Sequence, residues 1–315
     1  MKNRMDMKRI KPGDVFYIKL GRNGIWEEDC ISNGTLRLGY RETPHKLCLA
    51  KKWNSVQKER QRSRKNKRAA TSDTKQIRSF YEADENVLWV TFWKGSLYWC
   101  FSKPEVMQLE DKSKVRPVIG AWNSCDIKNT PLLMSQLSGK LLAMQGFQGT
   151  ICFVKEDKYL INKINAIQPK AVKEAEEALR QLEQKVEAVI RNLTWRDFEL
   201  LIDLIFRQAG WKRISGLGGT MKSLDLDLIS PVTSERYGVQ VKSKATRAVY
   251  HTYRTERLKD MQGFTRFYFA VHTPSSDLMQ AEETGTEGVE LLLPINIARL
   301  SVEYGLTKWI LDKAR

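Results

Sequence analysis

One segment, residues 223–245, constrains the fold more than any other because its apolar and polar residues alternate strictly. Every second residue of 224–229 is leucine, and valines alternate with polar residues in 237–242. This period of two is that of a β-strand with one buried face. A short proline-containing stretch, Ser230–Arg236, joins the two runs. We therefore expect a β-hairpin with the leucines and valines in one core.

Four polar side chains would then meet on the opposite face of this hairpin: Asp225, Asp227, Gln240 and Lys242. Phosphodiester hydrolysis needs a cation on the phosphate, an activated water and stabilisation of the developing charge. Carboxylates hold Mg²⁺, which needs only one or two of them from the protein. A lysine beside the metal water can orient or deprotonate it. The alternative interpretation is a surface hairpin whose outer face is simply polar, as in any half-buried sheet.

The pattern D-x(12)-Q-x-K, formed by Asp227, Gln240 and Lys242, resembles the core of the PD-(D/E)xK nucleases, and more specifically that of the Mrr-type restriction endonucleases. Upstream, TWRDFELLIDLIFRQAGW resembles the opening helix of that family, and SGLGGTMKSLDLDL resembles its glycine-rich approach, which includes Gly218 and Gly219. Downstream, FYFAVHTP resembles the next core strand. The resemblance spans roughly residues 193–310. It implies an α/β restriction-endonuclease-like core, with a mixed central sheet flanked by helices.

The resemblance also implies roles for individual residues. Asp227 takes the place of the metal-binding aspartate, and Lys242 that of the catalytic lysine. Gln240 stands where most relatives have a carboxylate and would offer its carbonyl oxygen to the metal. Glu199 matches a helical glutamate that reaches towards the site. Asp225 faces the same way as Asp227 and stays open as a metal ligand, and the implied cofactor is Mg²⁺ or Mn²⁺.

The charge balance of the chain points to a polyanionic partner. Fifty-three Lys and Arg residues against 37 Asp and Glu give a net charge of +16, which favours nucleic acid over an anionic membrane surface. Residues 60–68 carry six basic side chains, and we expect them to form a mobile loop. The residues expected to bind double-stranded DNA are Arg62, Arg64, Lys65 and Arg68 in this run and Lys222, Lys244 and Arg247 near the hairpin. A solvated basic surface is the alternative for each of them.

The N-terminal part, residues 1–165, is expected to be a β-rich DNA-recognition domain. Its short apolar runs predict strands over Val15–Leu20, Thr35–Tyr40, Val87–Phe92 and Leu97–Phe101, with a tight turn at Lys94–Gly95. It contains six of the nine tryptophans. Trp93, Trp99 and Trp122 are candidates for recognising a modified or flipped base, whereas Trp89 is expected in the core. The architecture weakly resembles PUA-like readers of modified bases.

A helix is predicted over residues 166–193, before the nuclease-like domain at 194–315. Its apolar residues recur at alternating steps of three and four: Val172, Ala175, Leu179, Leu182, Val186, Val189 and Leu193. This heptad pattern is typical of a coiled coil. A homodimer through residues 172–193 is one interpretation, and a connecting helix packed on its own domain is the other.

The sequence contains no uncharged apolar stretch long enough for a membrane helix. Its five cysteines are widely spaced and include no C-x-x-C pair, so we expect a reduced, cytoplasmic protein. The prediction is a metal-dependent DNA endonuclease of restriction or anti-phage type. A structure-specific nuclease or resolvase is the alternative enzyme, and an inactive DNA-binding regulator is the alternative outside enzymes.

Overall fold

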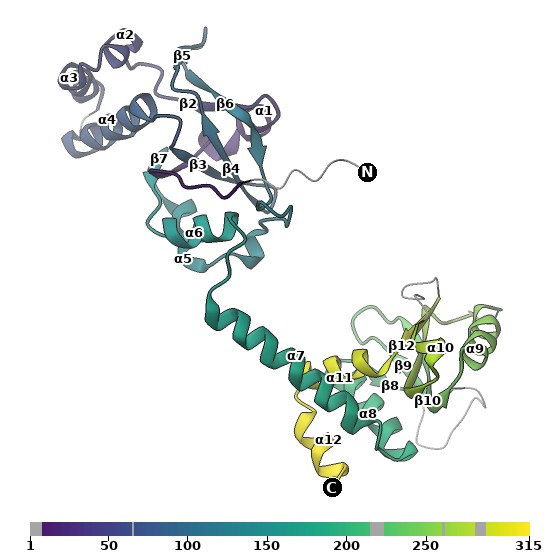
Figure 1. Cartoon of the computed structure of the whole chain (residues 1–315). Coiled ribbons are helices and arrows are strands. Elements are labelled where there is room, and N and C mark those ends of the chain that lie inside the picture. The colour runs from purple at the N-terminus through teal and green to yellow at the C-terminus, as the bar shows by residue number, and fades with distance from the viewer. Residues whose placement is uncertain (1–7, 65, 215–223, 260–261, 281–287) are drawn as a thin grey trace. The chain divides into compact units, whose positions relative to one another are not determined.

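The computed structural model describes residues 8–64, 66–214, 224–259, 262–280 and 288–315 (Figure 1). The chain divides into two compact units, Met1–Pro169 and Lys170–Arg315. Each unit is a mixed α/β structure with its own sheet. The predicted glycines Gly218 and Gly219, and the predicted DNA contacts Lys65 and Lys222, lie outside the described residues.

The first unit is built on a seven-stranded sheet with the order β2-β6-β4-β3-β1-β7 and with β5 paired to β6. The strands are β1 (Val15–Ile18), β2 (Thr35–Leu38), β3 (Leu88–Trp93), β4 (Ser96–Ser102), β5 (Met107–Gln108), β6 (Lys114–Asn123) and β7 (Ile151–Phe153). The predicted turn is confirmed: Lys94 and Gly95, both with positive φ, join the antiparallel strands β3 and β4. Strand β1 lies between β3, which runs parallel to it, and β7, which runs antiparallel.

Helices cover both faces of this sheet (Figure 1). One core contains residues of α1 (Glu27–Ser32), α2 (His45–Leu49), α3 (Trp53–Ser63) and α4 (Lys67–Glu82). The core on the other face contains residues of α5 (Gly139–Leu142) and α6 (Asp157–Ile164). Three short 3₁₀ turns complete the described part of the unit: Arg22–Gly24, Met134–Gln136 and Ala143–Gly146. The first unit therefore contains more helix than the predicted β-rich domain.

The predicted mobile loop over residues 60–68 is wrong, because most of this run is helical. Helix α3 ends at Ser63, and α4 begins at Lys67 with the Asn66 side chain accepting hydrogen bonds from two backbone N–H groups of its first turn. The reason lies in Arg60, which is buried and forms a 2.6 Å ion pair with buried Asp73 of α4. This pair and the apolar residues around it pack the two helices together.

A buried arginine fixes the other end of α4 to the sheet. Arg116 of β6 is fully buried and donates hydrogen bonds to three backbone carbonyls, those of Phe80, Ala83 and Lys103. Two of these carbonyls belong to the last turn and the C-cap of α4, whose acceptors have no partner within the helix. The position of α4 on the sheet is therefore set by polar contacts as well as by apolar packing.

The second unit has a five-stranded sheet with the order β12-β11-β10-β9-β8. Its strands are β8 (Lys212–Arg213), β9 (Leu226–Ile229), β10 (Arg236–Ala245), β11 (Arg266–Pro274) and β12 (Val289–Leu292). Strands β8, β9 and β10 are antiparallel neighbours, and β11 runs parallel to both β10 and β12. This is compatible with an α/β nuclease-like fold, as expected.

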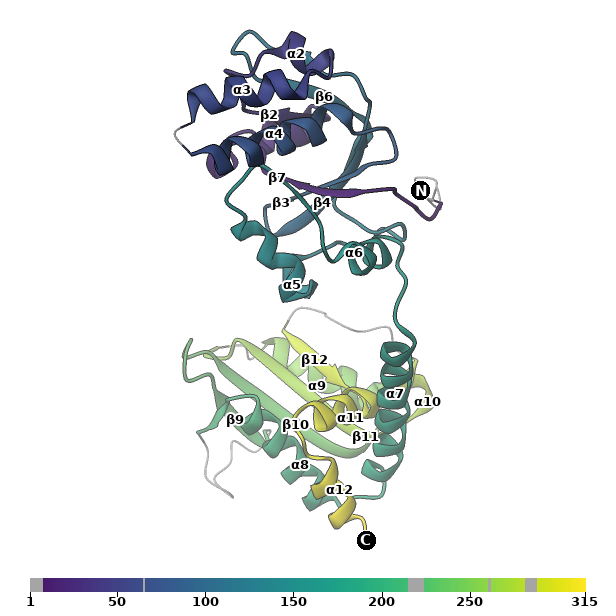
Figure 2. The same ribbon diagram turned by 90° about the vertical axis from the view of Figure 1, so that its left-hand side faces the viewer.

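The helices of the second unit form two groups, one for each face of the sheet (Figure 2). The first core contains residues of α7 (Lys170–Ile190), α8 (Trp195–Gln208), α11 (Pro294–Glu303) and α12 (Thr307–Lys313). The second contains residues of α9 (Arg247–Lys259) and α10 (Ser276–Met279). Helix α8 begins directly after Thr194, whose side chain accepts a hydrogen bond from the backbone N–H of Asp197.

The heptad residues of α7 divide into two sets. Val186 and Leu193 are buried in the core with α8 and α11. Val172, Leu179 and Leu182 are exposed, each with 40% or more of its surface accessible. The C-terminal end of the predicted seam therefore packs inside its own unit, and only residues 172–182 present an apolar stripe to solvent.

Candidate active site

The hairpin predicted from the alternating segment is present, with one change at its start. Strand β9 pairs antiparallel with β10, and Leu226 lies opposite Val239 in the core shared with α8. Leu224 does not share their face, because it precedes the regular strand and packs in the opposite core beside Phe267. Gly238 makes room for it: a Cβ atom there would lie 2.9 Å from Leu224 and 2.5 Å from the Phe267 ring.

This change sets the position of Asp225. The backbone N–H of Asp225 donates to the carbonyl of Val239 at 3.0 Å. Its Oδ2 atom accepts hydrogen bonds from the backbone N–H of Val241 at 2.6 Å and from the Gln240 amide. Asp225 is thus fixed against the middle of β10 by three contacts, two of them formed by its carboxylate.

Asp227, the aspartate that the resemblance assigned to the metal, has a different partner. Its two carboxylate oxygens accept a bidentate pair of hydrogen bonds from Arg236, one of them 2.8 Å long. The Arg236 guanidinium in turn lies over the Phe264 ring, 4.5 Å from its centre. The contacts therefore join Gln240 to Asp225 and not to Asp227.

Glu199 of α8 is close enough to Asp225 for their charges to interact. Burial raises the pKa of the Glu199 carboxyl, the negative charge of Asp225 raises it further, and Arg213 partly opposes both effects. Two carboxylates that repel one another in this way are stabilised by a cation. Asp225 therefore accepts a hydrogen bond from Gln240 of β10 and carries a negative charge that acts on Glu199 of α8.

This donor set suits a hard divalent cation. Among the described residues no group of three or more His, Cys, Asp or Glu side chains forms a metal site. Two carboxylates and one amide oxygen are nonetheless enough for Mg²⁺ or Mn²⁺, which usually retain several water ligands. Glu199, Asp225 and Gln240 would hold such an ion.

Lys242 and Lys244 follow Gln240 along β10, at intervals of two residues, and both side chains are exposed. By strand alternation they lie on the same face as Gln240. Lys242 thus lies two residues from Gln240 on the same face of β10. Arg247 begins α9 and is exposed, and its Nε donates to His251 at 3.3 Å.

Sequence reasoning missed two residues that support the cluster, Arg213 and Asp203. The Arg213 guanidinium is mostly buried, with 11% of its side-chain surface exposed, and donates to the backbone carbonyl of Asp225 at 3.0 Å. It also lies 3.8 Å from Asp203, a buried carboxylate of α8 that pairs with Arg207 at 2.8 Å. The available signal was the spacing of Glu199 and Asp203, which places two acids on neighbouring turns of an otherwise apolar helix face.

His272 is buried on β11 and packs edge-on against Phe198, with 4.5 Å between ring centres. Burial lowers its pKa, and the positive charges of Arg191 and Lys244 lower it further. The imidazole is therefore neutral at physiological pH, and its Nδ1 lies 2.8 Å from the Thr273 hydroxyl. These contacts agree with a structural role.

The three candidate tryptophans of the first unit differ in accessibility. Trp99 and Trp122 are buried, with 3% and 7% of their surface exposed, and each indole N–H donates to a backbone carbonyl. Both sheet faces are covered by helices, so neither ring reaches a base, and this prediction is wrong for them. Trp93 is partly exposed, with the Lys94 ammonium 4.2 Å from its ring centre. Trp89 lies in the core as expected.

The predicted DNA contacts of the first unit lie on or between α3 and α4. Arg62 and Arg68 are exposed, and Arg62 also forms an ion pair with Glu59 at 2.7 Å. Arg64 is half exposed, and its Nε lies 2.9 Å from the buried carboxylate of Asp73. Within the described parts of the chain, no helix has the length and hydrophobicity needed to cross a membrane.

Comparisons with known proteins add little to this geometry. No family model matches the chain, and no curated protein matches it. Among solved structures it is similar to a DNA modification-dependent restriction endonuclease, AspBHI, with a TM-score of 0.28 and 11% sequence identity. That match covers 72% of this chain and 68% of the other. A similarity this low establishes neither the fold nor the function of this chain.

Proposed function

We propose that this chain is a metal-dependent endonuclease of restriction or anti-phage type that hydrolyses DNA phosphodiester bonds. The observation that carries the proposal is the cluster of Glu199, Asp225 and Gln240, with Lys242 two residues further along β10. Oxygen ligands of mixed charge beside an exposed lysine are suited to phosphoryl chemistry. The net charge of +16 supports nucleic acid as the substrate.

The residues of the cluster have separate tasks in this proposal. A bound Mg²⁺ or Mn²⁺ supplies Lewis acidity at the phosphate and lowers the pKa of a bound water. Asp225, oriented by the Val241 N–H and the Gln240 amide, and Glu199 provide the negative charge that retains the cation. The Lys242 ammonium orients the attacking water and offsets the charge that develops on the phosphate oxygens. The oxygen of water would bond to phosphorus as the water loses a proton, and the bond to one ester oxygen would break, with that oxygen taking up a proton and leaving as a hydroxyl.

Target choice is assigned in this proposal to the first unit. Trp93 is the candidate tryptophan that reaches the surface, and its ring is suited to stacking on a base. Recognition of a modified base would make the enzyme selective for foreign DNA. The exposed basic residues Arg62, Arg68, Lys244 and Arg247 would add affinity for phosphates that does not depend on sequence.

A second candidate function is favoured by one observation. Gln240 stands where a carboxylate would strengthen the site, and its amide donates a hydrogen bond to Asp225 instead of adding a negative charge. A site with one carboxylate fewer holds a cation more weakly. The second candidate is therefore a DNA-binding regulator with an inactive nuclease core.

Cleavage of both strands requires two active sites, and the exposed stripe of α7 offers a way to provide them. Val172, Leu179 and Leu182 continue the heptad pattern of the buried Val186 and leave an apolar edge in solvent. We propose that a second copy of this chain covers the stripe. Two helices with the same heptad register are complementary to one another.

Plasmid cleavage with Mg²⁺ or Mn²⁺ tests the proposal on unmodified, cytosine-methylated and phage-type modified DNA. Asp225→Asn and Lys242→Ala should reduce the cleavage rate by at least ~10²-fold, the usual effect of removing one transition-state contact. Asp227→Asn is the matched control, since it makes the same charge change two residues away and should retain most activity. Loss of cleavage in Asp227→Asn alone would reject our assignment. No cleavage on any substrate, with DNA binding intact, would favour the second candidate.

A further inference from the structure

The exposed side of α4 carries Lys67, Arg68 and Lys75, while the neighbouring arginines Arg62 and Arg78 form ion pairs with Glu59 and Glu82. Between Glu59 and Glu82 the chain has eight basic residues and a single acidic residue, Asp73. Asp73 is 5% exposed, and its Oδ2 lies 2.6 Å from Arg60 and 2.9 Å from Arg64. This carboxylate therefore pairs with the two arginines before α4, Arg60 and Arg64, and the contacts it forms do not involve Lys67, Arg68 or Lys75.

Lys67, Arg68 and Lys75 line a concave surface. Five residues of α4 line a groove of about 370 Å³: Lys67, Arg68, Thr71, Ser72 and Lys75. They belong to successive turns of one helix face. None of the five is acidic or strongly apolar, which distinguishes this groove from the apolar cavity of about 670 Å³ beside β7. Such a lining suits an anion and gives an apolar ligand no surface to bury.

The length of the groove matches the spacing of several phosphates along one DNA strand. Lys67 and Lys75 are eight residues apart in α4, so they lie about 12 Å apart along the helix axis at 1.5 Å per residue. The phosphates of one DNA strand rise by about 3.4 Å each. Three cations over this length can therefore contact consecutive phosphates of a single strand.

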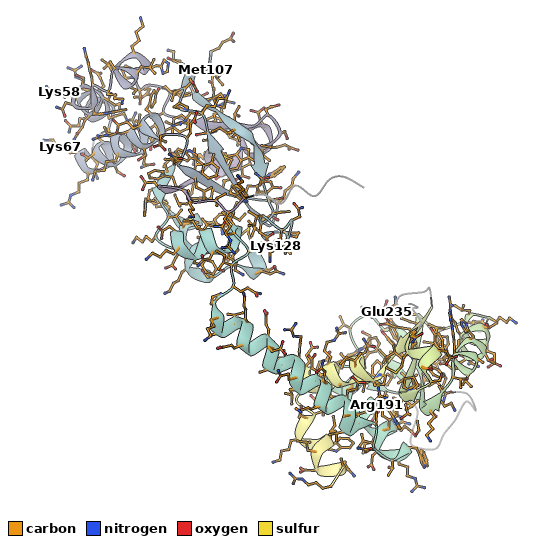
Figure 3. All side chains as sticks on the ribbon, in the orientation of Figure 1. Lys58, Lys67, Met107, Lys128, Arg191 and Glu235 are labelled. Carbon is orange, nitrogen blue, oxygen red and sulfur yellow. The ribbon has the colours of Figure 1, made fainter. Side chains whose placement is uncertain are left out.

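The helix is held in place independently of any ligand. At its start, the Asn66 side chain accepts hydrogen bonds from the backbone N–H groups of Arg68 and Ala69. These N–H groups therefore have a partner within the protein, and an anion would be bound by the side chains of α4. At its end, Arg116 binds the carbonyls of Phe80 and Ala83. The cations thus project from a fixed scaffold (Figure 3, where Lys67 is labelled).

We propose that the α4 groove is a phosphate-backbone binding site of the first unit, and that Lys67, Arg68 and Lys75 contact one strand of duplex DNA there. This inference rests on the proposed function in that it supplies the nucleic-acid contact of the unit that selects the target. The contact is independent of base sequence, because only phosphates are bound. It positions the unit on DNA and leaves base recognition to other residues.

The test is binding of the full-length protein to a fluorescent duplex in EDTA, measured by anisotropy over a range of KCl concentrations. The variant Lys67→Gln, Arg68→Gln, Lys75→Gln is compared with Lys103→Gln, Lys128→Gln, Lys158→Gln, which removes the same charge from exposed positions elsewhere in the unit. Lys128 lies at the other end of this unit from Lys67 (Figure 3). Circular dichroism checks that both variants are folded.

Each phosphate contact contributes about 0.9 to the slope of log K against log salt. The groove variant should therefore lower the magnitude of the slope by about 2 to 3 and weaken binding at least tenfold near 0.1 M salt, whereas the control variant should change the slope by less than about 1. The conservative variant Lys67→Arg, Lys75→Arg should bind like the wild type. Equal slopes for the groove and control variants would overturn the inference. Competition by polyglutamate as effective as by duplex DNA would also overturn it.

These experiments test the nuclease proposal and the α4 groove proposal independently of one another. EDTA removes the cation that cleavage requires, so a slope change in the groove variant is measured whether or not the second unit is a nuclease. Cleavage by the wild type together with an unchanged slope in the groove variant would refute the groove alone.

Discussion

Gln240→Glu is the substitution whose consequences can be worked out most fully from the site. Gln240 is 8% exposed and donates its amide hydrogen bond to the Asp225 carboxylate. Glutamate has nearly the same shape but cannot donate when ionised. The change therefore replaces an attraction by a repulsion at a fixed position and leaves the packing almost unaltered.

The size of the effect follows from two contributions. Loss of a hydrogen bond to a charged group costs about 1.5–3 kcal/mol. Two carboxylates about 4 Å apart repel by about 4 kcal/mol at an effective dielectric constant of 20. Proton uptake by the introduced carboxyl limits the sum of the two costs, because protonating a glutamate of ordinary pKa at pH 8 costs about 5 kcal/mol, at about 1.4 kcal/mol per pKa unit. We expect the free energy of unfolding in EDTA at pH 8 to fall by about 3–5 kcal/mol.

The sign of the pH dependence follows from the same repulsion. In the folded variant the pKa of the introduced carboxyl is raised above its unfolded value, so the folded state binds the proton more tightly. The destabilisation is therefore small near pH 4, where the group is protonated in both states and can donate to Asp225. It grows as the pH rises through the raised pKa.

Urea unfolding of the wild type and the variant, with EDTA and with saturating Mn²⁺, measures both effects. A third carboxylate should strengthen cation binding, so Mn²⁺ should stabilise Gln240→Glu by at least about 2 kcal/mol more than the wild type. Gln208→Glu, at an exposed position of α8, is the matched control and should change stability by less than about 0.5 kcal/mol. Unchanged stability of Gln240→Glu in EDTA at pH 8 would refute its contact with Asp225. A large loss that Mn²⁺ does not recover would refute the cation site.

Three further predictions concern other parts of the second unit. Arg213→Gln should lower the free energy of unfolding by about 2 kcal/mol in chemical denaturation, because it removes a charged donor from a buried carbonyl and leaves Asp203 with one arginine instead of two. Burial and the charge of Asp225 raise the pKa of Glu199, so the metal-free protein should lose stability as pH rises from the ordinary value of 4.5. Glu199→Gln should flatten stability against pH over this range, and an identical profile would contradict the raised pKa of Glu199. Leu179→Lys with Leu182→Lys should convert a dimer to a monomer in sedimentation velocity, and an unaltered dimer would place the interface elsewhere.

The hairpin and the helix before it could be predicted from the sequence because both depend on local patterns. Alternation in 226–229 and 237–242 specifies two strands, and Thr194 is a strong N-cap. The different hydrogen-bond partners of Asp225 and Asp227 could not be predicted in this way. It depends on Leu224 leaving the strand to fill the space beside Gly238, and alternation holds only inside a regular strand.

Charged and aromatic residues were harder to interpret in the first unit. The basic run of 60–68 was predicted to be mobile because a charge run is usually solvated, yet Arg60 finds a buried partner 13 positions away in Asp73. Trp99 and Trp122 were candidate readers because aromatic rings can stack on a base, but a sheet covered on both faces buries both rings. Such contacts depend on tertiary packing, which a local pattern does not contain.

The position of β1 between β3 and β7 has a consequence for biosynthesis. Its neighbours, β3 and β7, follow it by roughly 70 and 135 residues in the chain. At about 5–20 residues per second, a ribosome needs roughly 7–30 s after β1 before the last partner strand is made. Throughout that interval an apolar strand has an unpaired edge, which is the state in which chains associate with one another. We therefore expect nascent chains that end before Ile151 to require chaperone protection.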